Sequence, residues 1–111
     1  MTDSQANSDL DRATVRNLRR IAHHLDPVVL VGEQGVSDAV VTETGRALAD
    51  HELIKVKIHA GDREVRRELA EALAAATDAA VVQSIGKVWV LFRRNPEPDP
   101  KLSNLTRFSA S

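Results

Sequence analysis

Two glycines separated by two residues, Gly32 and Gly35, frame the loop whose residue types most clearly suggest a binding site in this chain. They follow an apolar run at residues 28–31 and precede a segment with helical spacing that begins near Val36. Because glycine lacks Cβ and tolerates positive φ, such a loop lets an anion approach the backbone and the free N–H groups of a helix start. A loop of this kind can clamp the sugar-phosphate backbone of single-stranded nucleic acid. The alternative is a plain strand-to-helix turn that needs small residues.

Basic side chains form the second candidate feature. Residues 10–25 hold four arginines and one acid, Asp11, which makes a local charge of +3. Residues 86–94 hold three basic side chains and no acid, also +3, although the whole chain has a net charge of −1. A polarised surface of this kind is compatible with a phosphate partner. The candidate RNA-contacting residues are Arg12, Arg16, Arg19, Arg20, His23, Gly32, Glu33, Gln34, Gly35, Lys55, Lys57, Lys87 and Arg93.

Each basic group also has a structural interpretation. The arginines of residues 12–25 would form the solvated face of an amphipathic helix. Lys55 and Lys57 would lie on an open sheet face or guard against aggregation. Basic side chains at positions 63, 66 and 67 have acidic neighbours at helical spacing, which favours salt bridges over RNA contact. Trp89 is predicted to lie in the core rather than to stack on a base.

Catalytic and metal-binding patterns are not found in the sequence. There is no cysteine, and no two of the four histidines have the i, i+4 spacing of helical metal ligands. No nucleotide-binding Walker loop and no nucleophile with a candidate base appears. The sequence therefore predicts a protein that is not an enzyme and uses neither metal nor cofactor.

The elements that would position these residues follow from periodicity and caps. Helical spacing predicts helices over residues 12–25, 37–51 and 62–76, with Gly45 packed closely against a neighbour. Strands are predicted at residues 28–31 and 53–59, and two more at 79–94 joined by a turn at Gly86. The order α-β-α-β-α-β-β implies an α/β fold with a four-stranded mixed sheet. Helices would cover one face, and the first would cross the other face over Trp89 and Leu91.

Composition divides the chain into three parts. Residues 1–9 are polar and are expected to form a flexible tail without the features of a signal peptide. Residues 10–94 would form one domain. Residues 95–111 begin with three alternating prolines and are predicted to be a disordered tail. No apolar stretch approaches the ~20 residues of a membrane span, so a cytoplasmic protein is expected.

Four segments resemble one known family in order and spacing. LRRIAHHL at residues 18–25, PVVLVGEQG at 27–35, HELIKVKI at 51–58 and IGKVWVLFR at 85–93 are similar to the CRM-domain, or YhbY-like, RNA-binding proteins. The resemblance covers about residues 10–94 and implies a fold related to the C-terminal domain of translation initiation factor 3. The family often has a basic or small polar residue inside its Gly-x-x-Gly loop, whereas this chain has Glu33 and Gln34.

The resemblance implies a bacterial stand-alone, non-catalytic protein that binds precursors of the large ribosomal subunit. RNA would be its partner, no membrane is implied, and a monomer is expected. An alternative is a protein-interaction module in which the acidic segment with Asp38, Glu43 and Asp50 docks a basic partner. A third, weaker interpretation is a domain that binds phosphate or a small ligand.

Overall fold

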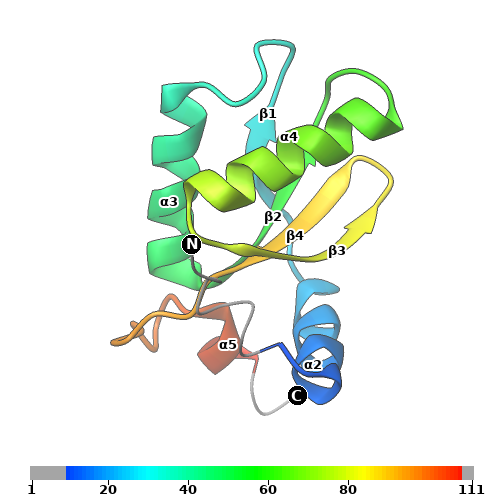
Figure 1. The fold of residues 1–111 in the computed structure, drawn as a ribbon. Coiled ribbons are helices and arrows are strands. Elements are labelled where there is room, and N and C mark those ends of the chain that lie inside the picture. Colours follow the sequence, from blue (N-terminus) through cyan, green and yellow to red (C-terminus); the bar gives the residue numbers. More distant parts are fainter. Residues whose placement is uncertain (1–9, 109–111) are drawn as a thin grey trace.

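The computed structural model describes residues 10–108, and its elements follow the predicted order with one addition at the C-terminal end (Figure 1). The predicted α-β-α-β-α-β-β order is confirmed, and the predicted tail at residues 1–9 lies outside the described residues. The elements are α2 (Arg12–Ala22), β1 (Pro27–Val31), α3 (Asp38–His51), β2 (Leu53–Ile58), α4 (Arg63–Ala76), β3 (Ala80–Ile85), β4 (Val88–Phe92) and α5 (Asn104–Arg107).

The four strands form one mixed sheet in the order β1-β2-β4-β3. β1 runs parallel to β2, and β4 is antiparallel to both β2 and β3. A parallel pair needs a crossover connection, which α3 provides between β1 and β2. The predicted four-stranded mixed sheet is therefore confirmed.

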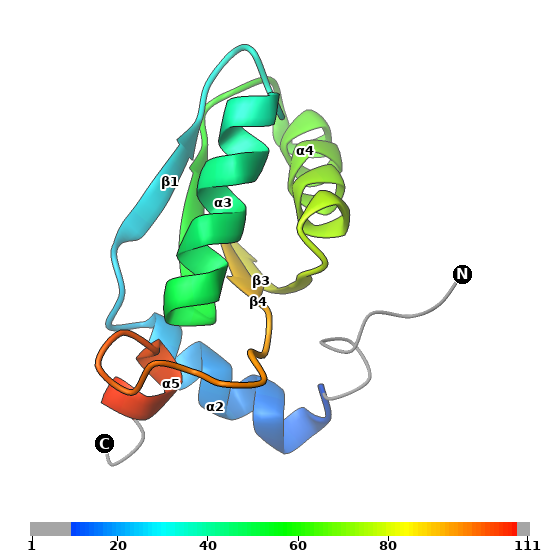
Figure 2. The same cartoon turned by 90° about the vertical axis from the view of Figure 1, so that its left-hand side faces the viewer.

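Helices cover the two faces of the sheet unequally (Figure 2). α3 and α4 lie on one face over a core that includes Val56, Trp89 and Leu91. α2 packs against one end of the other face, where Val90 and Phe92 are buried. The expectation that the first helix lies over Trp89 and Leu91 is wrong, because alternation along β4 turns these two side chains to the face of α3 and α4.

Three side chains cap the starts of the long helices. Asp11, Ser37 and Asp62 accept hydrogen bonds from backbone N–H groups three residues later, at 2.8, 3.2 and 3.0 Å. The N–H of Thr14 lowers the pKa of Asp11, because it stabilises the ionised carboxylate. These caps explain where the helices begin.

Two local expectations are corrected. α2 ends at Ala22 rather than Leu25, with His23 as its C-cap. Gly45 is not required by close packing, since a Cβ at this position would meet nothing within 4 Å. Its carbonyl instead accepts a hydrogen bond of 3.1 Å from Arg93.

Residues 95–108 differ from the predicted disordered tail, because they are ordered against the domain and include α5. Asn104 Nδ2 donates to the carbonyl of Leu53 at 2.7 Å, and Phe108 packs beside α2. Prolines do prevent a regular element at residues 95–103, but side-chain anchors hold this segment in place. Residues 109–111 lie outside the described part of the chain. No helix within residues 10–108 is both long and apolar enough to cross a membrane.

Candidate nucleic-acid interface

The loop at residues 32–35 is a tight turn between β1 and α3. Gly35 N–H donates to the carbonyl of Gly32 at 3.0 Å, and Ser37 N–H donates to the carbonyl of Gly35 at 3.1 Å. Gly35 has φ of +72°, and a Cβ there would lie 3.4 Å from Leu69 Cδ2 of α4. The backbone conformation of the turn therefore explains why residue 35 is glycine.

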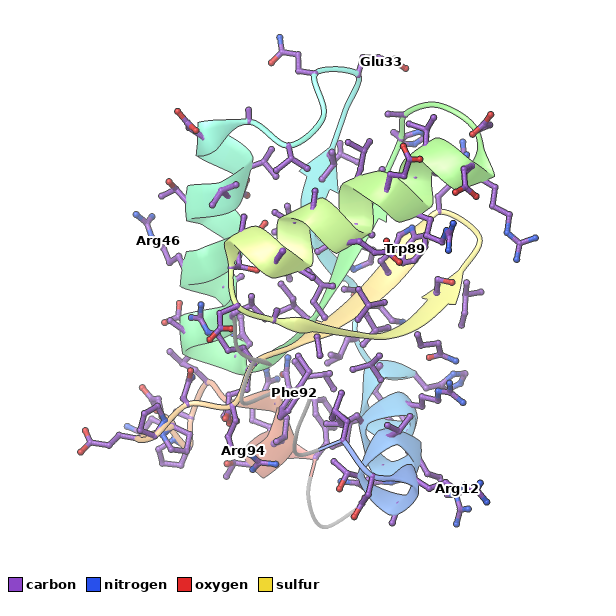
Figure 3. The ribbon with its side chains drawn as sticks, in the orientation of Figure 1. Arg12, Glu33, Arg46, Trp89, Phe92 and Arg94 are labelled. Carbon is purple, nitrogen blue, oxygen red and sulfur yellow. The ribbon has the colours of Figure 1, made fainter. Side chains whose placement is uncertain are left out.

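Gly32 has no such structural requirement. Its φ lies outside the left-handed region, and a Cβ built on it would meet nothing within 4 Å. Glu33 and Gln34 are exposed at the corners of the turn, and Glu33 lies at the far tip of the loop (Figure 3). The loop thus presents bare backbone at Gly32 next to a carboxylate that extends into solvent.

Three of the predicted arginines share one side of α2. Arg12, Arg16 and Arg19 are exposed, follow the i, i+4, i+7 spacing of a helical stripe, and line an open groove of about 540 Å³. Arg20 differs, since its guanidinium donates to Asn17 Oδ1 at 2.8 Å and to the carbonyl of Phe108 at 3.4 Å. The arginine stripe of α2 (Arg12, Arg16 and Arg19) is therefore available to a partner.

The loop and α2 lie at opposite ends of β1, with Glu33 at one end of the molecule and Arg12 at the other (Figure 3). β1 has five residues, so it separates them by about 16 Å. The open sheet face between them carries Lys55 and Lys57, which point to the same side as α2. Lys57 pairs in register with Leu30, which is 60% exposed.

The side chains of Lys55 and Lys57 differ in their positions and in their hydrogen bonds. Lys55 Nζ donates to the carbonyl of Leu25 at 2.9 Å, which holds it at the end of α2. Lys57 lies two residues further along β2, toward the loop. Together the arginine stripe, the two lysines and the loop form a basic path (Arg12, Arg16, Arg19, Lys55, Lys57 and residues 32–35) along one side of the sheet.

Two residues predicted to contact RNA, Arg93 and Lys87, lie outside the basic path. Arg93 points inward, where its guanidinium donates to the carbonyl oxygens of Thr77 at 3.0 Å and Gly45 at 3.1 Å. It joins α3 to the end of α4, and the RNA contact at Arg93 stays a prediction. Lys87 is exposed at the turn between β3 and β4, outside the basic path.

The structural interpretations of Trp89 and Arg67 agree with the structure, whereas that of Arg66 does not. Trp89 is 7% exposed and lies in the core, as predicted. Arg67 pairs with Glu64, and this partner raises the pKa of Arg67. Arg66 instead donates to the carbonyl of Gly61 at 3.0 Å, which the predicted salt bridge did not anticipate.

The remaining candidate residues are histidines near the end of α2 and acidic residues of α3. His23 is exposed, and His24 stacks on Phe108 with ring centroids 5.7 Å apart. No group of three His, Cys, Asp or Glu in residues 10–108 is arranged to hold a metal ion. Asp38 and Glu43 are exposed on α3, and Arg46 lies on the outer side of the same helix (Figure 3).

A family model for the CRS1/YhbY (CRM) domain matches residues 10–93. The chain belongs to this family. The match spans α2 to the end of β4, so the CRM domain contains the loop, the arginine stripe and both lysines of the basic path. It ends before residues 95–108.

Relatives of this CRM domain include curated proteins and a solved structure. A probable RNA-binding protein of Pseudomonas aeruginosa is 46% identical over 94 residues, which cover 85% of this chain and 90% of the relative. An RNA-binding protein of Haemophilus influenzae is 45% identical over 80 residues, covering 72% and 81%. The solution structure of a hypothetical protein from Staphylococcus aureus matches with a TM-score of 0.71 and 34% identity, covering 79% of this chain and 92% of that one.

Proposed function

We propose that this protein is a non-catalytic RNA-binding protein that acts on large-subunit ribosomal RNA precursors during ribosome assembly. Its relatives in Pseudomonas aeruginosa and Haemophilus influenzae are named as a probable RNA-binding protein and an RNA-binding protein. The ribosomal target comes from the resemblance to stand-alone CRM proteins.

The open space around Gly32 is the observation that supports RNA contact at the loop. Gly35 is explained by its positive φ, whereas nothing within 4 Å prevents a side chain at Gly32. A residue without Cβ at an exposed position lets a phosphate reach the backbone N–H groups of the turn. The loop also precedes the N-terminus of α3, where the helix dipole favours an anion.

The basic path gives the mechanism. The arginine stripe of α2 binds phosphates at one end, Lys55 and Lys57 continue along the sheet, and the loop binds the backbone at the other end. These contacts position RNA and carry little sequence information. Specificity then comes from the shape of the RNA, because a strand must span the length of β1 to contact both ends of the path.

Sedimentation of a cell lysate tests the proposal. The protein should comigrate with precursors of the large ribosomal subunit, and ribonuclease treatment should release it to the top of the gradient. A variant with Arg16→Ala and Arg19→Ala should move part of the protein to the top of the gradient without ribonuclease. Comigration that survives complete RNA digestion would instead indicate a protein partner.

A further inference from the structure

A second recess lies on the other side of the sheet from the basic path, between the start of α4 and the turn of the β3–β4 hairpin. Figure 1 shows where these two elements lie. Its volume is about 750 Å³, which is within the range of small-ligand sites. The α4 recess is lined by Asp62, Arg63, Glu64, Arg66, Arg67, Ser84, Gly86 and Trp89.

Two residues that line this recess each have a buried N–H group with no acceptor among residues 10–108. The groups are Nε of Arg66 and Nε1 of Trp89, whose side chain is more than nine-tenths buried. Trp89 lies beneath α4 on the side of the hairpin (Figure 3). Buried donors in proteins are almost always paired, so two at one recess call for an acceptor.

The charges at the recess favour an anion. Three arginines and two acids line it, for a sum of +1. Both acids are already engaged, because Glu64 pairs with Arg67 and Asp62 Oδ1 accepts from the N–H of Val65 at 3.0 Å. Arg63 and Arg66 form no ion pair within the described part of the chain and remain to bind a negative ligand.

Arg66 has one hydrogen-bonded and one unpaired donor at its guanidinium. Its Nη1 donates to the carbonyl of Gly61 at 3.0 Å, and its buried Nε must turn toward the recess to reach a ligand. Guanidinium groups bind phosphate with two parallel N–H donors, and Nε is one of the atoms that takes part.

We propose that the α4 recess binds a phosphate group of a nucleotide, with Arg66 Nε–H and Trp89 Nε1–H as donors and Arg63 as an additional positive charge. Where bound RNA supplies this phosphate, the inference rests on the proposed function. The strand would reach the recess from the loop at residues 32–35, because Gly35 packs near Leu69, one helical turn after Arg66.

Trp89 provides a direct readout, since it is the single tryptophan of the chain. Its indole N–H gives one signal in a proton–nitrogen NMR correlation spectrum of the labelled full-length protein. Short single-stranded RNA should shift this signal downfield as the N–H gains an acceptor. Separate titrations with uridine monophosphate and inorganic phosphate distinguish a free phosphate compound from a phosphate of the RNA chain.

Arg66→Ala should abolish the indole shift at RNA concentrations that saturate the unchanged protein and weaken RNA binding about ten- to hundredfold, the loss expected for one charge-assisted hydrogen bond. Arg46→Ala is the matched control, since it removes the same charge from the exposed side of α3 and should keep the shift. Trp89→Phe retains an aromatic ring without the N–H and should weaken binding in the same direction, while a thermal melt reports on folding.

The outcomes separate the two proposals. RNA binding without an indole shift from any of the three probes overturns the α4 recess and leaves the proposed function standing; ordered water then satisfies the two donors. An indole shift of equal size in Arg66→Ala also overturns it, because the shift would arise elsewhere. A shift with uridine monophosphate in a protein that binds no RNA supports the recess and contradicts the proposed function.

Discussion

Ser103 Oγ donates a 2.6 Å hydrogen bond to Oε1 of Glu52, although the two residues are 51 positions apart in the sequence. The second oxygen of Glu52 accepts from the N–H of Asn95 at 2.7 Å, and Glu52 is only 3% exposed. A buried carboxylate needs such partners, since burial without them is unfavourable. This pair explains why the segment after β4 is ordered.

The first prediction concerns this pair. Ser103→Ala should lower the free energy of unfolding by about 1–3 kcal/mol, because it leaves one buried oxygen of Glu52 without a donor. Urea unfolding followed by Trp89 fluorescence measures the change. Thr42→Ala on the exposed side of α3 is the control and should stay within ~0.5 kcal/mol. Equal stability of the two variants would mean that the C-terminal segment contributes little to the fold.

RNA binding should depend strongly on salt. The basic path offers roughly 3–5 phosphate contacts, so log K should fall against log salt with a slope of about −2 to −3.5 for single-stranded RNA. Fluorescence anisotropy of labelled RNA at several salt concentrations gives this slope. A slope near zero would contradict phosphate binding.

The arginine stripe can be tested with a charge-matched pair of variants. Arg16→Ala with Arg19→Ala should weaken RNA binding about fivefold, since each exposed charge pair contributes on the order of 0.5 kcal/mol. The salt slope should become shallower by about 1.4 for two lost contacts. Arg46→Ala with Lys101→Ala removes the same charge from exposed positions off the path. Similar losses in both double variants would show that α2 contributes only general positive charge.

At the loop, Glu33→Lys should tighten RNA binding by about 0.5–2 kcal/mol, because it replaces a repulsive charge with an attractive one. The gain should shrink at high salt through screening. Anisotropy titrations at low and high salt measure both effects. An unchanged affinity at low salt would place Glu33 away from the RNA.

The two glycines of the loop should respond differently to substitution. Gly32→Asp should weaken RNA binding by about 0.5–2 kcal/mol without unfolding, because space around Gly32 is open and the added charge meets phosphate. Gly35→Ala should lower the melting temperature, since residue 35 has φ of +72°. Calorimetry and anisotropy on both variants separate the two effects. Normal RNA binding by folded Gly32→Asp would make the loop a plain turn.

Local signals in the sequence were enough to predict the elements. Asp62 follows a glycine and precedes an apolar stripe, and it caps α4 as such a residue should. Alternation from Leu53 to Ile58 predicted β2 and placed Lys55 and Lys57 on one face. These features depend on residues within a few positions of each other, so they are visible without the fold.

The roles of single arginines could not be predicted in the same way. Arg93 looks like a basic surface residue in sequence, yet it bonds to carbonyl oxygens 16 and 48 positions away. Arg66 has acidic neighbours at helical spacing, yet its Nη1 bonds to a carbonyl and its Nε has no acceptor among residues 10–108. Charge and spacing do not distinguish these cases, because the deciding partner lies elsewhere in the chain.

The sequence by itself determined the order of helices and strands, the family and the presence of two basic clusters. Only the tertiary structure decided that Gly32 and the arginine stripe of α2 lie at opposite ends of β1, with Lys55 and Lys57 between them. It also decided that residues 95–108 pack on the domain through Glu52. The physical reason is that caps and alternation act between neighbours, whereas the position of a surface and the partner of a buried carboxylate depend on contacts between distant residues.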